Sequence, residues 1–241
     1  MIDTVGLDAD DTLWHNESIF ADYEQRMADL VARYLPGVDF HQRLIELERH
    51  NVAIFGYGIK GFVLSMIETA IEATEGRITA QEIHAIVGWA KEMHAHPVEL
   101  LDGVADTVEK LAHRYRLVLI TKGDLWNQET KIAASGLADR FDAVEIVAEK
   151  DEATYARLFE RHGIIIDRFV MVGNSLRSDI EPVVALGGRG VHIPYHLTWD
   201  LEHATVSPHD RWVELSDIRQ LPPWLASQRC HNRYPCKSRM E

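Results

Sequence analysis

The chain has 241 residues, of which 46% are hydrophobic, enough to bury one sizeable core or a core with a smaller satellite domain. Its formal net charge of −13 disfavours broad nucleic-acid binding, because displacing counterions from phosphates needs a basic surface. No apolar stretch approaches the roughly 18 residues that a membrane-spanning helix requires. An acidic protein can still bind a phosphorylated metabolite where cations, a metal ion or backbone N–H groups gather locally.

The N-terminus carries no basic region and no cleavage site, so we do not expect a secretory signal. The two cysteines, Cys230 and Cys236, lie near the C-terminus, so a disulfide framework does not hold the fold. Together with His231 they match no standard zinc spacing. We therefore expect a cytoplasmic protein, a monomer or a homodimer, that binds neither nucleic acid nor membrane.

The first predicted element is a strand at Thr4–Leu7, and a long helical segment follows it. Residues 15–97 carry apolar residues at helical spacing in three stretches, and Thr79-Ala80-Gln81-Glu82 predicts a capping box before the third. The simplest interpretation is that these stripes pack against one another as a core of their own. Trp14–Ser18 and His96–Leu101 are the expected linkers to the rest of the chain, and "FGYGIKGF" is an expected connecting loop.

Beyond this insert, short strands rich in Val, Ile and Leu alternate with helical patterns, a pattern typical of a parallel sheet buried on both faces. A helix is predicted at Asp151–His162, with Gly163 as its stop. The fold class predicted is α/β, a doubly wound parallel sheet with an inserted helical domain. The later strands are expected at Leu117–Ile120, Val144–Val147, Phe169–Val172 and Gly190–Ile193.

These elements predict three regions. Residues 1–14 and 98–226 form the α/β core, and residues 15–97 form the helical domain. Residues 227–241, basic and poor in apolar side chains, form a tail that we expect to be disordered or irrelevant to the fold.

An acidic stretch, Asp8-Ala9-Asp10-Asp11, directly follows the first strand. In an open parallel sheet, ligands bind beyond the carboxyl ends of the strands. A divalent cation at this place would offset the repulsion between Asp8 and Asp10, since hard cations prefer oxygen ligands. The alternative is that Asp10-Asp11-Thr12 merely forms a polar turn and a helix cap.

Three further strand ends carry residues suited to phosphate and metal. Thr121-Lys122-Gly123 offers a hydroxyl and a glycine that lets N–H groups approach an anion. Lys150 follows the third strand, while Asn174 and Asp179 follow the fourth and offer oxygen ligands. Taken singly, each residue also has a non-functional interpretation: Thr121 as an ordinary strand-end residue and Lys150 as a solvated surface lysine. Their order at successive strand ends is improbable by chance.

At these residues the sequence resembles the haloacid dehalogenase-like (HAD) hydrolase superfamily. The first family motif, Asp-x-Asp-x-Thr-Leu, is matched by Asp8, Asp10, Thr12 and Leu13. Thr121 matches the second motif and Lys150 the third, and Gly173 with Asp179 matches the fourth. The resemblance extends to about residue 225, and the helical insert lies where many members carry an α-helical cap.

The resemblance implies a Mg²⁺-dependent phosphatase that acts on a small phosphorylated metabolite. Asp8 would be the nucleophile that forms an aspartyl-phosphate, and Asp10 the general acid and base. Thr121 and Lys150 would complete the catalytic set and, with Lys122 and Gly123, bind the phosphoryl group. The implied Mg²⁺ ligands are Asp8, Asp10, Asn174 and Asp179. Asp11 receives no role beyond support of the turn, and Lys60, His15 and Asn16 are weak candidates for substrate contacts.

One position departs from the family pattern, because Asn174 stands where the fourth motif usually has an aspartate. An amide oxygen can coordinate Mg²⁺, but without the negative charge that a carboxylate contributes, so Asp179 would carry more of the metal binding. Two rival functions remain. A 2-haloacid dehalogenase uses the same nucleophile, but Asp10 favours a phosphatase because halide leaves without a proton. A non-catalytic phospho-ligand-binding relative is the other rival, and a phosphomutase has no specific support.

Overall fold

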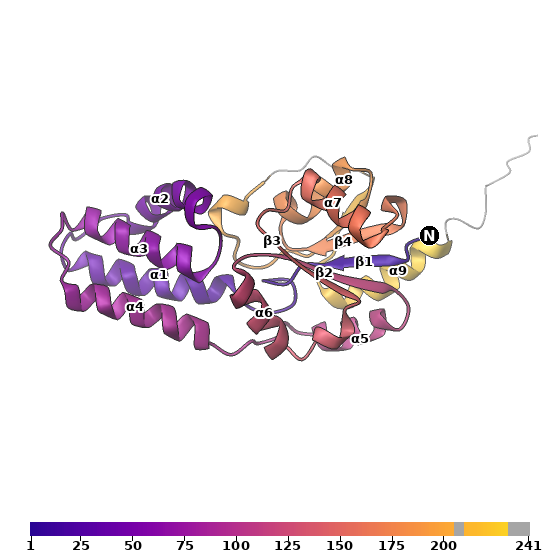
Figure 1. The fold of residues 1–241 in the computed structure, drawn as a ribbon, viewed down its shortest axis with the longest axis horizontal. Helices are drawn as coiled ribbons and strands as arrows, with labels where there is room; N and C mark the ends of the chain where they lie inside the picture. The colour runs from indigo at the N-terminus through magenta and orange to yellow at the C-terminus, as the bar shows by residue number, and fades with distance from the viewer. Residues whose placement is uncertain (205–209, 231–241) are drawn as a thin grey trace, which may run out of the picture.

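The computed structural model describes residues 1–204 and 210–230, which form two parts joined end to end (Figure 1). A bundle of helices from residues 17–95 lies at one end, and the sheet with its flanking helices lies at the other. The chain crosses between them twice, directly after the loop that follows the first strand and again before residue 104. This arrangement confirms the predicted fold class, a doubly wound core with a helical insert.

The core contains six parallel strands in the order β3-β2-β1-β4-β5-β6. The strand order reverses at β1: β2 and β3 follow on one side of it, and β4, β5 and β6 follow on the other. The carboxyl end of β1 is therefore beside the topological switch point, where open α/β sheets bind their ligands. The strands are β1 Thr4–Leu7, β2 Arg116–Lys122, β3 Ala143–Val147, β4 Phe169–Gly173, β5 Arg189–His192 and β6 Trp212–Glu214.

Helices cover both faces of the sheet, as the apolar character of the strands requires. Along β2, Leu117 and Leu119 pack into one buried cluster, which includes Leu111. Val118 and Ile120 face the opposite way into another, which includes Tyr155. The two clusters explain why the strands show no polar alternation. The core helices are α5 Val104–Ala112, α6 Leu125–Ala134, α7 Glu152–His162, α8 Glu181–Ala185 and α9 Leu221–Cys230.

The insert consists of α1 Glu17–Ala32, α2 Phe40–Phe55, α3 Ile59–Ala73 and α4 Ala80–Ala95. Its buried apolar side chains, such as Met27, Leu44 and Met66, form a cluster separate from both clusters of the sheet. The predicted capping box at the start of α4 is present, since the Thr79 side chain accepts from the Glu82 N–H and the Glu82 side chain accepts from the Thr79 N–H.

The structure differs from the prediction in five places. Helix α2 was not predicted, because its buried face includes Glu48 and Asn51 and so lacks a continuous apolar stripe. The sequence does not predict strand β6, because this strand has only three residues and lies at the sheet edge. The predicted loop "FGYGIKGF" shrinks to residues 56–58, and α1 already begins at Glu17, inside a predicted linker.

The fifth difference concerns the C-terminal segment. Helix α9 runs to Cys230, so the predicted tail, which starts at residue 227, begins too early. Leu221 and Leu225 of this helix pack against the core and hold the helix on the sheet. His231 and Cys236 lie outside the described residues, as does the rest of the predicted tail.

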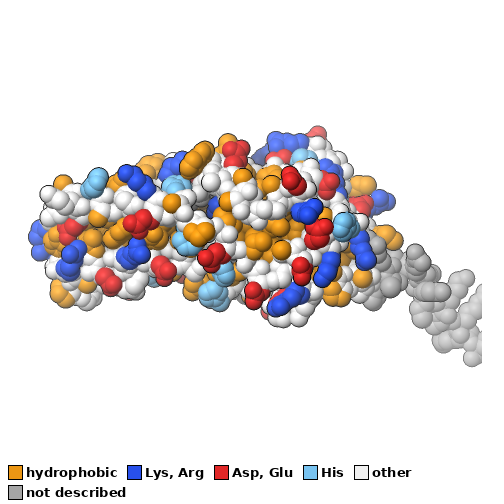
Figure 2. Space-filling model, turned by 90° about the horizontal axis from the view of Figure 1, so that it is seen from below, with side chains coloured by type: hydrophobic (Ala, Val, Ile, Leu, Met, Phe, Trp, Pro, Cys, Tyr) orange, Lys and Arg blue, Asp and Glu red, His pale blue; other side chains and the backbone are white. Residues whose placement is uncertain are grey.

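The surface mixes charges of both signs. On the face shown in Figure 2, Lys and Arg side chains are interspersed with Asp and Glu, and apolar side chains are exposed between them. Within the described part of the chain, no helix is long and apolar enough to cross a membrane.

Candidate active site

The loop after β1 carries the first acidic residues of the site. The Asp8 N–H donates to the Val172 carbonyl at 2.9 Å, which continues the β1–β4 pairing by one residue. The loop then folds back, with Asp11 in the left-handed region at φ 62°. The Asp11 carboxylate accepts hydrogen bonds from the N–H groups of Asn16 and Glu17 at 2.8 and 3.0 Å. Asp11 therefore supports the turn into α1, as predicted.

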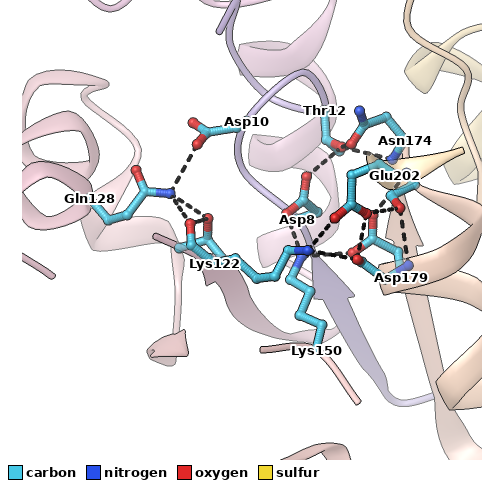
Figure 3. A network of polar contacts seen from close by, with 12 residues as sticks. Asp8, Asp10, Thr12, Lys122, Gln128, Lys150, Asn174, Asp179 and Glu202 are labelled. Atoms are coloured by element: carbon cyan, nitrogen blue, oxygen red, sulfur yellow. Dashed lines mark hydrogen bonds and ion pairs between the residues drawn. The ribbon is translucent and has the colours of Figure 1, made fainter. Parts of the chain in front are cut away.

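Asp8 and Lys150 form the buried centre of the site (Figure 3). The Lys150 ammonium pairs with Asp8 Oδ1 and, at 2.7 Å, with Asp179 Oδ1. Thr12 Oγ1 donates to the other Asp8 oxygen at 2.9 Å. Burial raises the pKa of Asp8 to about 7, although Lys150 acts in the opposite direction. Burial alone would lower the pKa of Lys150, but Asp179 and Asp8 together raise it above its usual value.

Asn174 points toward the same centre from the loop after β4 (Figure 3). One terminal atom of its amide lies 3.3 Å from Asp8 Oδ2 and 3.3 Å from the Asp10 carbonyl oxygen. The second oxygen of Asp179 accepts from the Ser175 N–H at 3.1 Å, so both Asp179 oxygens are engaged. In the described residues, no three His, Cys, Asp or Glu side chains are grouped to hold a metal ion.

The Asp10 carboxylate lies on the other side of the loop and faces α6. Lys131 Nζ contacts both of its oxygens, at 2.6 and 2.8 Å, and the Trp14 indole N–H donates at 2.7 Å. Gln128 Nε2 donates to Asp10 at 3.0 Å and to Thr121 Oγ1 at 2.7 Å. Gln128 thereby ties the loop after β1 to the end of β2, where Thr121 is fully buried.

Lys122 and Gly123, predicted to bind phosphate, continue from β2. The Lys122 ammonium contacts Glu202 and lies 2.8 Å from Ser178 Oγ, and it also lies 4.4 Å from the centre of the Tyr57 ring. Gly123 has φ 138°, a backbone conformation that residues with a side chain rarely adopt. The structure therefore brings Asp8, Lys150, Asn174 and Asp179 into contact, while Lys122 is occupied by other partners.

These residues line one cavity between the core and the insert, with a volume of about 170 Å³. All eight predicted site residues line it, and the insert contributes residues of α1, α2 and α3. The weak candidates have other partners. Lys60 pairs with Asp124 at 2.7 Å on the surface, and His15 lies 2.6 Å from the Tyr195 hydroxyl. Asn16 lines the cavity and accepts from Lys131 at 3.1 Å.

The haloacid dehalogenase-like hydrolase family matches residues 2–187 of the chain. The chain belongs to this family. The match spans the acidic loop, the whole insert and the four strand ends that carry the site, so the HAD motifs and the observed geometry coincide.

The chain is also similar to individual hydrolases. A haloacid dehalogenase-like family hydrolase from Xanthomonas campestris is 44% identical, covers 95% of this chain and 93% of its own, and superposes with a TM-score of 0.86. The N-acylneuraminate-9-phosphatase of Mus musculus is 32% identical over 176 residues, which are 68% of this chain and 67% of the mouse protein. The magnesium-bound HAD-hydrolase YfnB from Bacillus subtilis is 16% identical over 93% of this chain and 98% of its own, with a TM-score of 0.64, and shares the fold.

Several residues of this HAD site were not predicted from the sequence. Gln128 and Lys131 are three residues apart on α6 and so share a face, but a polar pair of this kind is common on solvated helices. Glu202 lies far along the chain, yet its carboxylate accepts from Ser175 and Ser178 at 2.5 Å each. No local pattern in the sequence indicated that this glutamate returns to the site.

Proposed function

We propose that this HAD-like hydrolase is a Mg²⁺-dependent phosphatase that cleaves a small phosphomonoester through an aspartyl-phosphate on Asp8. The observation that supports this most directly is the buried contact between Asp8 and Lys150, with a second carboxylate, Asp10, two residues further along the loop. A nucleophile beside a fixed cation suits attack on an anionic phosphoryl group. The mouse relative, named a phosphatase, supports the same class of reaction.

The donor set fits Mg²⁺. Asp8 Oδ2, the Asp10 carbonyl and the Asn174 amide would hold the ion, because the amide atom lies 3.3 Å from each of the other two oxygens. Carboxylate, carbonyl and amide oxygens are the ligands that Mg²⁺ prefers, and the structure brings these three groups close together. With its nitrogen turned inward, Asn174 donates to these oxygens, and with its oxygen turned inward it would join them as a ligand of the ion. When bound, Mg²⁺ would neutralise charge on the phosphoryl oxygens and keep Asp8 ionised.

The first half-reaction transfers the phosphoryl group to the protein. An Asp8 oxygen attacks phosphorus, the bond from phosphorus to the leaving oxygen breaks, and Asp10 gives that oxygen its proton. Lys150 would neutralise the incoming dianion, and Thr121 would donate to a phosphoryl oxygen. In the structure both Asp10 oxygens contact Lys131 Nζ, and Asp10 lines the cavity in which the leaving oxygen would lie.

The second half-reaction regenerates the protein. Asp10, now a carboxylate, takes a proton from water, and the hydroxide formed attacks phosphorus of the aspartyl-phosphate. The bond between phosphorus and Asp8 breaks and inorganic phosphate leaves. The helical insert would cover the cavity during both steps and limit the access of other water molecules.

The test is phosphate release from p-nitrophenyl phosphate with Mg²⁺ and with EDTA, run beside chloride release from 2-chloropropionate. We expect phosphate release that depends on Mg²⁺ and no chloride release. Chloride release with no phosphate release would support a dehalogenase. Absence of both reactions, with phosphate still bound, would support a protein that binds phospho-ligands without turnover.

A further inference from the structure

The side of the cavity formed by the insert differs in charge from the side formed by the core. Its acidic residues are Glu17 and Glu24 from α1 and Glu48 from α2. The aromatic residues Phe20 and Phe62 of the insert and Trp199 of the core line the same cavity. Considering the described residues, the insert contributes no Lys or Arg to the cavity wall. We call this region, defined by Glu17, Glu24, Glu48 and the three aromatic residues, the acidic wall.

Two carboxylates of the acidic wall lack an ion-pair partner among the described residues. Glu48 is only 6% exposed, and within that part of the chain its hydrogen-bond donor is the Trp199 indole N–H at 3.0 Å. Within residues 1–204 and 210–230, neither Glu48 nor Glu17 forms an ion pair with Lys, Arg or His, whereas Glu24 pairs with His41. Burial, with further contributions from other carboxylates, raises the pKa of Glu17 to about 8 and that of Glu48 to about 7.

The lysines of the cavity are already engaged elsewhere. Lys150 is held by Asp8 and Asp179, Lys131 by Asp10, and Lys122 by Glu202. These ion pairs lie at the core side, where the phosphoryl group would bind. Among the described residues that line the cavity, no cation is free to neutralise a second negative group on the substrate.

We infer that the leaving group is an alcohol that carries a protonated amine, bound at the acidic wall beside Glu17 and Glu48. This rests on the phosphatase activity proposed above. An isolated buried carboxylate is unfavourable, and an ammonium group would give Glu48 and Glu17 the partner that the protein itself does not supply. Aromatic faces add attraction for a cation. Without a cation beside them, the raised pKa values favour the protonated form of both glutamates, and an ammonium group would favour the ionised form. A neutral polyol would offer no such cation, and a leaving group with its own carboxylate would add a further negative charge to the acidic wall.

The test compares phosphomonoesters that differ in one terminal group. The compounds are 2-aminoethyl, 2-hydroxyethyl and carboxymethyl phosphate, each with homologues that extend the spacer by one and two carbons so that reach does not limit the result. At the best spacer length we expect kcat/KM to fall from amine to hydroxyl to carboxylate. The amine should exceed the carboxylate by at least about tenfold, given unit charges at close range in a partly buried site.

Two variants locate the effect. Glu48→Gln and Glu17→Gln keep the side-chain shape and remove the charge, so each should lower the amine-to-carboxylate ratio, by roughly threefold or more. Glu46→Gln is the matched control, because Glu46 is exposed on the same helix as Glu48 and does not line the cavity. It should leave the ratio unchanged.

The outcomes separate this inference from the proposed activity. Hydrolysis of p-nitrophenyl phosphate with no preference for the amine, or a ratio that both glutamate variants leave intact, would overturn the amine assignment while the phosphatase stands. Failure to hydrolyse any phosphomonoester, p-nitrophenyl phosphate included, would overturn the proposed activity instead.

Discussion

The two sides of the cavity differ in whether their carboxylates have a positively charged partner. On the core side, Asp8 and Asp179 share Lys150, and Asp10 is paired with Lys131. On the acidic wall, Glu48 is buried and Glu17 is half-buried, and among the described residues neither forms an ion pair. A buried pair fixes geometry, whereas a buried single charge is costly unless a ligand completes it. We therefore expect the core side to hold the reacting groups in place and the insert to select the leaving group.

The largest expected effect is the loss of activity on replacing Asp8, the proposed nucleophile. Asp8→Asn should abolish turnover while the fold is retained, because an amide has nearly the same shape but is a poor nucleophile. Phosphate release and the circular dichroism spectrum would be measured together. Asp3→Asn is the control, since Asp3 is exposed just before the same strand and should keep full activity. Near-normal turnover by Asp8→Asn would contradict covalent catalysis.

Asp10 comes next in size of effect. Asp10→Asn should slow hydrolysis of alkyl phosphates by about 10²–10⁴-fold, the usual loss for a missing general acid and base. The loss should shrink for aryl phosphates, whose leaving groups depart with less protonation. The rates of alkyl and aryl esters would be compared for both proteins. An equal loss on both would assign Asp10 to holding Lys131 and the loop in place.

These two aspartates also show what the sequence could predict. The first strand and its acidic loop are local, since β1 and the motif at Asp8 and Asp10 lie within ten residues, and β1 has the predicted bounds. Lys150 and Asn174 were predicted to join them because parallel strands bring their carboxyl ends together, and the contacts agree. Whether they act as proposed stays a prediction.

The acidic wall could not be predicted, because its members are close only in the folded chain. Glu48 lies on α2, a helix whose buried face includes polar side chains, and its hydrogen-bond donor, Trp199, is 151 positions away. In the sequence each of these glutamates resembles any solvated acid of a strongly acidic protein. Burial is what distinguishes them, and burial depends on how the insert lies over the sheet.

A smaller effect is expected at Asn174, on the core side. Asn174→Asp should lower the Mg²⁺ concentration for half-maximal activity, because a carboxylate attracts the ion more strongly than an amide does. Asp179→Asn should raise that concentration through loss of a charge near the ion and of a partner for Lys150. Titration of Mg²⁺ against activity distinguishes the variants. An unchanged Mg²⁺ dependence in Asn174→Asp would place the residue outside the metal's ligand set.

The smallest effect concerns the stability of the acidic wall without ligand. The pKa of Glu48 is raised from 4.5 to about 7, chiefly by burial and further by Glu24 and Asp200, while Trp199 and His41 act in the opposite direction. The folded state therefore binds the Glu48 proton more tightly than the unfolded state. Its contribution to the free energy of unfolding becomes less favourable as pH rises from about 4.5 to 7, and then levels off.

Glu48→Gln removes this titration, so its melting temperature should exceed that of the wild type at pH 8 and match it at pH 4. Each kcal/mol relieved raises the melting temperature of a chain of this size by roughly 2–4 °C, so a rise of a few degrees is expected. Glu46→Gln, on the exposed face of α2, should change neither value. A lower melting temperature for Glu48→Gln at pH 8 would mean that the buried charge stabilises the wall, and that the insert needs no cation to complete it.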